Sequence, residues 1–181
     1  MVIDRRTFLK NISIAAAGVM LPAVAVRAKT FLTVEQARKI LWGDAEMQPV
    51  IVELTEEQMD AIHSASDTRV RSDRLQAWRT ASGGWFIVDQ IIGKHENIDM
   101  AFALNHEGKV KGLEILTYRE TYGYEVQNLK WRAQFHGKDH SEILRLDHQI
   151  KNISGATLSC RHITDGINRL THTWHQVLQY I

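Results

Sequence analysis

Residues 154–159, with the sequence SGATLS, contain the side chain that is best suited to chemistry, the hydroxyl of Thr157. A hydroxyl that another enzyme is to modify must enter that enzyme's active site, so its neighbours in the chain have to be small. Gly155 and Ala156 meet this requirement, and Gly155 also permits a backbone bend that a residue with a Cβ would resist. The segment therefore predicts an accessible hydroxyl that another enzyme can modify.

A helical pattern follows this segment and continues to the last residue. Ser159 and Thr164 are candidate caps for its N-terminus, where free N–H groups and the helix dipole favour a phosphate. Apolar residues recur along the pattern at helical spacing and predict a face packed on the core. They are Ile163, Ile167, Leu170, Trp174, Val177 or Leu178, and Ile181. The alternative interpretation is a simple turn of small residues before a helix.

A second candidate segment lies upstream, at residues 119–125 with the sequence RETYGYE. Gly123 would let the backbone come close to a planar ring system, and the side chains of Glu120 and Thr121 can hydrogen-bond to the edges of such a ring. The same sequence is also an ordinary turn, so the segment alone is weak evidence. Its position upstream of Thr157 makes it more informative.

Together the two segments resemble the FMN-binding domain family, which includes the periplasmic flavin subunits of sodium-pumping quinone reductases and Rnf-type complexes. In that family a dedicated transferase joins FMN through a phosphoester to the threonine that Thr157 matches. The resemblance covers roughly residues 83–167 and implies that the bound cofactor is a covalently attached FMN. The residues that it assigns to the cofactor site, besides Thr157, are Ser154, Gly155, Ala156, Leu158, Ser159, Glu120, Thr121 and Gly123.

Two positions depart from the family pattern. Tyr122 stands where the family commonly has the proline of a Glu-Thr-Pro-Gly run. Lys151 stands three positions before the motif serine, where the family commonly has an acidic residue. This second change bears on the efficiency of attachment by the transferase more than on the binding of flavin.

Residues 1–28 predict an export signal rather than part of the fold. The sequence DRRTFLK at residues 4–10 resembles a twin-arginine signal, and an apolar, alanine-rich stretch follows at residues 12–26. That stretch is short for a membrane span, so we expect a signal peptide that is cleaved after Ala28. Asp4 replaces the serine or threonine that usually precedes the arginine pair. Export by this route implies a periplasmic protein that folds before it crosses the membrane.

The remaining residues, 29–181, have the length and apolar content of one domain with its own core. The signal holds four basic residues and one acidic residue, so this domain has 18 basic and 20 acidic residues and a formal net charge of −2. That balance argues against a nucleic-acid binder. Cys160 is the single cysteine, which excludes an internal disulfide, a c-type haem site and an iron–sulfur cluster held by this chain alone.

Cys160 itself is interpreted as a small buried residue in the first helical turn, the alternative being a reactive thiol. The histidine pairs His136 and His140, and His172 and His175, lack a recognisable third metal ligand, so we expect both pairs at the surface and no metal site. Trp174 is expected in the core rather than at a cofactor.

Upstream of the candidate site the patterns predict an α+β domain. Thr33 and Thr55 are candidate caps for helices at residues 34–42 and 56–65, and a strand at residues 50–54 lies between them. The charged residues 67–74 predict a solvated connection, with a phosphate clamp as the alternative. Residues 75–117 alternate with period two and contain glycine-rich turns, which predicts an antiparallel meander.

The sequence thus predicts an antiparallel sheet flanked by helices, in a periplasmic electron-transfer protein that carries FMN on Thr157. The expected partners are a flavin transferase and a membrane-bound or periplasmic redox protein, with no nucleic acid. No set of residues for turnover of a substrate is evident. Two alternatives stay open: a periplasmic flavin-dependent reductase or dehydrogenase with its own small substrate, and a non-redox binding module in which the motif is a relic.

Overall fold

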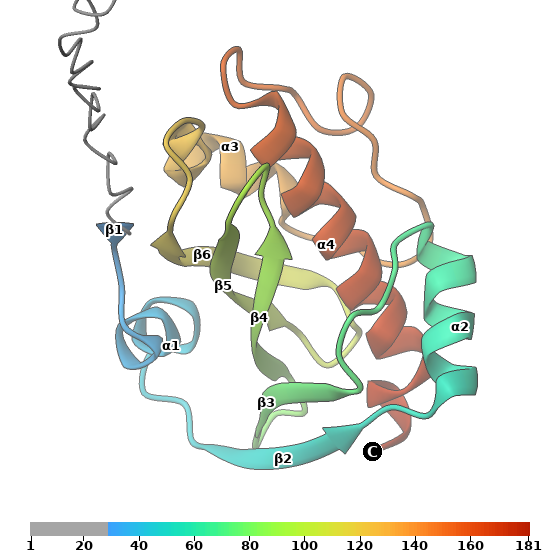
Figure 1. The fold of residues 1–181 in the computed structure, drawn as a ribbon. Coiled ribbons are helices and arrows are strands. Elements are labelled where there is room, and N and C mark those ends of the chain that lie inside the picture. Colours follow the sequence, from blue (N-terminus) through green and yellow to red (C-terminus); the bar gives the residue numbers. More distant parts are fainter. Residues whose placement is uncertain (1–28) are drawn as a thin grey trace, which may run out of the picture.

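Six antiparallel strands form one sheet, in the order β1-β6-β5-β4-β3-β2 (Figure 1). The computed structural model describes residues 29–181, so the predicted export signal at residues 1–28 lies outside the described residues. Every strand pairing except that of β1 with β6 joins neighbours in the chain. The strands are β1 (Lys29–Thr30), β2 (Met47–Glu53), β3 (Arg74–Thr80), β4 (Trp85–Ile92), β5 (Asn97–Leu104) and β6 (Val110–Tyr118).

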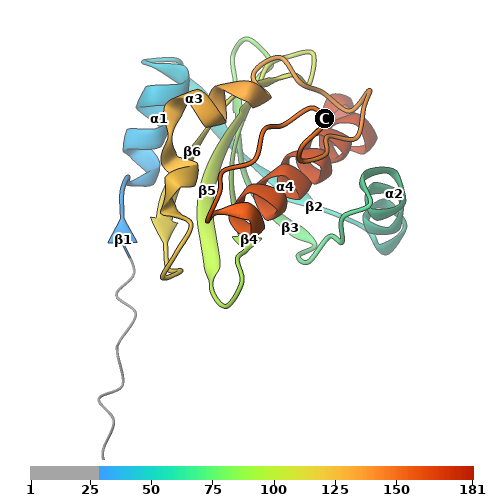
Figure 2. The same ribbon diagram turned by 90° about the horizontal axis from the view of Figure 1, so that it is seen from above.

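Helices cover both faces of this sheet (Figure 2). Helix α1 lies on one face, and α2 and α4 lie on the other. The helices are α1 (Val34–Trp42), α2 (Glu56–Ser66), α3 (Leu129–Arg132) and α4 (Thr157–Gln176), with 3-10 turns at Tyr124–Gln127, Ala133–Phe135 and Leu178–Tyr180. The larger core fills the space between the sheet and α4, and a smaller core lies under α1. The predicted α+β fold is confirmed.

Local signals account for where the first two helices begin. The side chain of Thr33 accepts a hydrogen bond from the backbone N–H of Gln36, whose side chain accepts one from Thr33 in return. The same reciprocal pair joins Thr55 and Gln58 at the start of α2. Each pair satisfies two N–H groups that the helix itself leaves without partners. The predicted caps are therefore confirmed.

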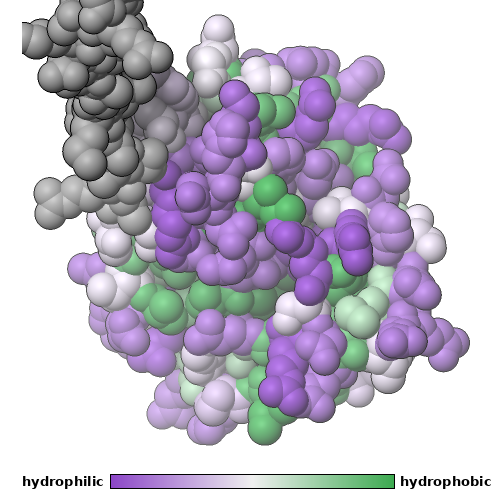
Figure 3. All heavy atoms as spheres, viewed as in Figure 1, coloured by the Kyte–Doolittle hydropathy of each residue, from purple (hydrophilic) through white to green (hydrophobic). Residues whose placement is uncertain are grey.

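The predicted meander is confirmed, with strand β2 added at its edge. This strand begins at Met47, three residues earlier than predicted, because it pairs with β3 along its whole length, from Met47 opposite Thr80 to Glu53 opposite Arg74. Within residues 29–181 no helix is long and apolar enough to cross a membrane. On the face shown in Figure 3, polar residues cover most of the surface and apolar ones lie between them in small groups.

Strands β3 and β4 separate part of the way along the sheet. They pair only from Gln76 opposite Val88 to Arg79 opposite Trp85, whereas β4 pairs with β5 over its full length. Beyond Val88, the side of β4 that faces away from β5 therefore has no strand beside it. The backbone N–H of Gln90 bonds there to the side chain of Asp89 at 2.8 Å. The sheet consequently has an opening next to the second half of β4.

An ion pair fixes the α3 region to the sheet. Nη1 of Arg132 lies 2.6 Å from Oε1 of Glu114 on β6, and each side chain is only 10% exposed. Arg132 also donates from Nε to the backbone oxygen of Gln127 at 3.1 Å. Removal of one partner from such a pair leaves an uncompensated charge in a poorly solvated place.

We expect Arg132→Ala to lower the free energy of unfolding by about 3–5 kcal/mol, because it leaves the carboxylate of Glu114 without its ion-pair partner. Urea denaturation followed by circular dichroism measures this change. The matched control is Arg74→Ala, which breaks the exposed pair of Arg74 with Glu53, at 3.0 Å and with side chains 76% and 58% exposed. That control should cost about 1 kcal/mol or less. Equal losses in the two variants would contradict a structural role for the Arg132 pair.

Candidate functional site

Three segments far apart in the sequence meet in one cavity of about 480 Å³. They are the hairpin between β4 and β5, the turn that follows β6, and the start of α4. A cavity of this size suits a small organic ligand. The predicted residues that line it are Glu120, Thr121, Gly123, Gly155, Ala156, Thr157, Leu158 and Ser159. Ser154 is exposed and does not line the cavity.

Thr157 is the first residue of α4, where the sequence predicted a surface loop leading into the helix. The residue is half-buried, and its Oγ1 accepts a hydrogen bond from Nδ2 of Asn152 at 3.1 Å. Gly155 has a φ of +88°, which confirms the predicted backbone bend just before the threonine. The hydroxyl is thus held on a rigid element at the wall of the cavity.

Neither predicted cap is at the start of α4. Ala156 occupies the N-cap position without a side-chain hydrogen bond, while Thr164 donates to the backbone oxygen of Cys160 inside the helix at 2.8 Å. The predictions for Ser159 and Thr164 were wrong because the helix begins two residues before Ser159. The first helical bond runs from Cys160 N–H to the oxygen of Ala156. The N–H groups of residues 157–159 therefore have no partner within the helix and favour an anion beside them.

The hydroxyl of Tyr118 joins two walls of the cavity. It donates to the backbone oxygen of Tyr122 at 2.6 Å and lies 2.8 Å from Oγ of Ser159 on α4. Gly123 packs against this pair with a φ of +93°, and a Cβ there would lie 2.6 Å from the tyrosine oxygen. Burial raises the pKa of Tyr118, so the phenol stays a hydrogen-bond donor. This contact alone requires a glycine at position 123, whether or not a ring binds beside it.

Glu120 has a structural partner that the sequence did not reveal. Its Oε1 accepts hydrogen bonds from the backbone N–H groups of His95, at 2.5 Å, and Glu96, at 3.1 Å. Burial alone would raise the pKa of Glu120, but these two N–H groups and the charge of His95 outweigh it and lower the pKa. The carboxylate consequently clamps the β4–β5 hairpin beside the cavity over the neutral pH range.

The clamped hairpin brings Lys94 and His95 to the cavity wall. Sequence reasoning missed both residues, because they stand in a short exposed connection between two strands and carry no motif. Their only sequence signal is the cluster of charged residues 94–96. Lys94 carries a positive charge and lines the same cavity as the start of α4, so an anionic group bound in this cavity would be stabilised by both.

Cys160 is fully buried, as predicted, and burial raises the pKa of its thiol. A thiol in this state is a packing residue and a poor nucleophile. Trp174 also lies in the larger core, as predicted.

The prediction of surface histidines was wrong for His172, which is buried. The loop before α4 places the ring of His140 on that of His175, with centroids 3.9 Å apart, and 6.1 Å from the ring of His172. Burial lowers the pKa of His140 and of His172, and the neighbouring histidines add to the effect. Within residues 29–181, no group of three or more His, Cys, Asp or Glu residues is placed to hold a metal ion.

We expect Tyr118→Phe to lower the free energy of unfolding by about 1–3 kcal/mol, because the Ser159 hydroxyl and the Tyr122 carbonyl lose a buried partner. Thermal and urea denaturation measure the change. Tyr180→Phe is the matched control: Tyr180 is 78% exposed, so its loss of a hydroxyl should change stability by about 0.5 kcal/mol or less. If both variants have the same free energy of unfolding as the parent, the Tyr118 hydroxyl does not hold the two walls together.

Comparison with known proteins agrees with the geometry. Residues 93–172 match the family model described as the FMN-binding domain. This range includes every residue that lines the 480 Å³ cavity. No curated protein matches the chain. The resemblance drawn from residues 119–125 and 154–159 is thereby confirmed, and the chain contains a flavin-binding domain.

Proposed function

Because residues 93–172 belong to the FMN-binding domain family, we propose that Thr157 carries FMN as a phosphoester and that the protein transfers electrons in the periplasm. One observation carries the proposal above the others. The motif threonine and the Glu120–Gly123 turn, which lie more than thirty residues apart in the sequence, line the same cavity. A motif that had become a relic would have no reason to keep a ligand-sized space beside its threonine.

The phosphate end of FMN fits the start of α4. The hydroxyl of Thr157 lies beside three N–H groups that the helix leaves without partners, and Lys94 adds a positive charge from the hairpin. These groups would hold the phosphate by charge and by hydrogen bonds. Asn152 also fits this end, because its Nδ2 donates to Oγ1 of Thr157 at 3.1 Å, and an ester oxygen at that position can still accept this hydrogen bond.

The ring end of FMN would lie against the turn at residues 121–123. When bound, flavin supplies the redox chemistry, and the protein supplies its position and its surroundings. Tyr122 is 80% exposed and Leu158 is 41% exposed at the edge of the cavity. A ring between them would remain accessible from outside. This accessibility favours exchange of electrons with a membrane-bound or periplasmic partner protein, and it supports the electron carrier over an enzyme with an enclosed substrate pocket.

Attachment at Thr157 requires a flavin transferase that can reach the start of α4. Ser154 and Gly155 are exposed just before it, so the enzyme can approach the motif from that side. The exposed Lys151 lies on the same approach. We propose that a basic residue here slows attachment without preventing it.

We expect Thr157→Ala to fold normally but to carry no covalent flavin after co-expression with a flavin transferase, because the attachment oxygen is gone. The loss of this half-buried hydroxyl and methyl, with the hydrogen bond from Asn152, should lower the free energy of unfolding by about 1 kcal/mol. Flavin fluorescence in a denaturing gel and intact mass measure attachment, and Thr157→Ser should retain part of it. The matched control is Thr121→Ala, which removes an exposed hydroxyl from the same cavity and should keep the flavin. Flavin that stays bound to the Thr157→Ala variant through denaturation would contradict attachment at Thr157 and indicate Ser154 or Ser159 instead.

The periplasmic location is proposed from Arg5 and Arg6. Replacement of both by lysine should leave the precursor in the cytoplasm, because twin-arginine export depends on the arginine pair. Cell fractionation and immunoblotting measure the distribution. Arg27→Lys changes an arginine near the end of the same segment and serves as the control, for which normal export is expected. Periplasmic accumulation of the Arg5 and Arg6 double variant at the parent's level would refute this route.

A further inference from the structure

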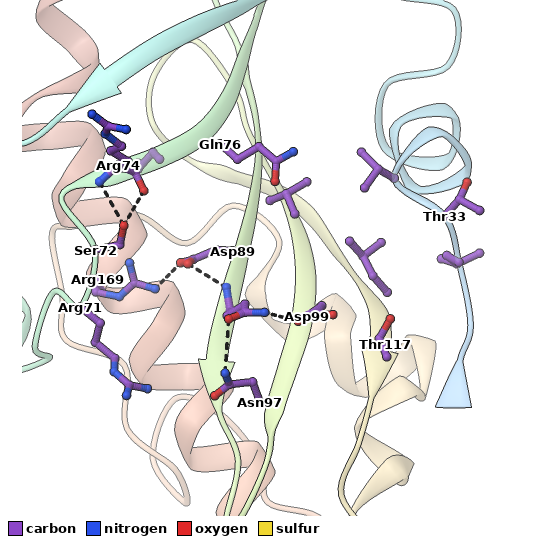
Figure 4. Close-up of a pocket in the computed structure, with 16 residues that line it drawn as sticks. Thr33, Arg71, Ser72, Arg74, Gln76, Asp89, Asn97, Asp99, Thr117 and Arg169 are labelled. Atoms are coloured by element: carbon purple, nitrogen blue, oxygen red, sulfur yellow. Dashed lines mark hydrogen bonds and ion pairs between the residues drawn. The ribbon is translucent and has the colours of Figure 1, made fainter. Parts of the chain in front are cut away.

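A groove of about 680 Å³ lies on the α1 side of the sheet (Figure 4). It shares no lining residue with the cavity at Thr157. The start of α1 forms one wall, strands β3 to β6 form the floor, and the connection before β3 forms the other wall. The floor combines apolar side chains, such as Val88 and Leu116, with polar ones, such as Gln76 and Thr117. Such a mixture in a cavity of this size is typical of small-molecule sites.

Arg169 reaches this groove from α4, on the opposite face of the sheet. It can do so because β3 has left β4 beyond Val88, which opens the sheet at that point. Nη2 of Arg169 bonds to Oδ2 of Asp89, and the two side chains are 11% and 27% exposed. A second cavity of about 360 Å³ lies on the α4 side and shares Arg71, Gln90 and Arg169 with the groove. The two arginines therefore stand where the two cavities meet.

Of the two arginines at this junction, Arg169 is paired with Asp89, and Arg71 supplies the charge that no ion pair balances within residues 29–181. Within the described residues, Arg71 is exposed and has neither an ion pair nor a side-chain hydrogen bond, and Figure 4 shows it extended beside the groove. Arg169 bonds to Asp89 through one nitrogen only, although a guanidinium has five N–H donors.

The nearby acidic groups are either engaged or poorly placed to balance these charges. Asp99 is paired with Arg119 and accepts a hydrogen bond from Gln90. Asp165 lines the smaller cavity but not the groove, and burial raises the pKa of its carboxyl. Arg69 adds a further positive charge to the same cavity.

We propose that the groove binds a small organic anion, whose terminal carboxylate or phosphate lies between Arg71 and Arg169. The planar guanidinium groups suit either oxyanion, because each can donate two parallel hydrogen bonds to it. The body of the ligand lies along the floor over Val88 and Leu116, towards Thr33 at the start of α1. The charged connection at residues 67–74, for which the sequence predicted a solvated connection with a phosphate clamp as the alternative, thereby becomes part of a binding site.

Titration of the purified protein with benzoate and with phenyl phosphate tests this proposal, and benzyl alcohol is the neutral probe. Isothermal titration calorimetry gives the affinity, and amide NMR shifts give the place. We expect saturable binding of at least one anion, with shifts at Val88, Gln90 and Thr117, and none with benzyl alcohol. Whichever anion binds more tightly identifies the ligand as a carboxylate or a phosphate. The titrations are made on the parent and on Thr157→Ala, so the result does not depend on flavin attachment.

Arg71→Gln should raise the dissociation constant about tenfold or more, as expected for loss of a charge-assisted contact. The matched control is Arg145→Gln, because Arg145 is exposed and lines neither cavity. Arg71 has no side-chain partner among residues 29–181, so its replacement should leave stability unchanged. Unaltered affinity in Arg71→Gln, equal binding of benzyl alcohol, shifts confined to the cavity at Thr157, or no saturation up to about 10 mM would each overturn the proposal.

Discussion

The candidate flavin site depends on one hydrogen-bonding group, the hydroxyl of Tyr118. This group stands at the end of the last strand and contacts both the turn that follows it and the start of α4. Its removal would leave the buried hydroxyl of Ser159 without this partner. A single side chain therefore links the turn to the start of the helix. Gly123 follows from this constraint, since any Cβ would enter the space that the hydroxyl occupies.

The close packing of α4 on the sheet keeps that arrangement rigid. A Cβ on Gly166, in the middle of the helix, would lie 2.3 Å from Cδ1 of Ile91 on β4. A glycine inside a helix destabilises the helix by about 1 kcal/mol relative to alanine. Gly166 therefore lowers the stability of α4 itself but allows the helix to pack closely on Ile91. Rigid support of this kind matters for a cofactor protein, because the site works only when its supporting residues fix the reactive group.

The features that the sequence predicted well are those with local causes. The capping pairs of Thr33 and Thr55 act over three residues, and the meander follows from alternation and from turns such as residues 105–108. The features that it missed depend on residues far apart. The clamp from Glu120 to His95 spans 25 positions, and the contact of Tyr118 with Ser159 spans 41. The point at which β3 separates from β4 likewise depends on which residues of the two strands pair. The alternation of apolar and polar residues does not specify that pairing.

The meander also sets the order in which the molecule can be assembled. Pairings between neighbouring strands close short loops and form early, whereas the cavity needs the hairpin at residues 94–95, the turn at residues 120–123 and the start of α4. Helix α4 is the last of these to leave the ribosome. Thr157 therefore takes its place beside Lys94 only after the sheet exists and the helix has docked on it. A modifying enzyme that recognises this surface would act as a check on folding, because a misfolded chain would not present it.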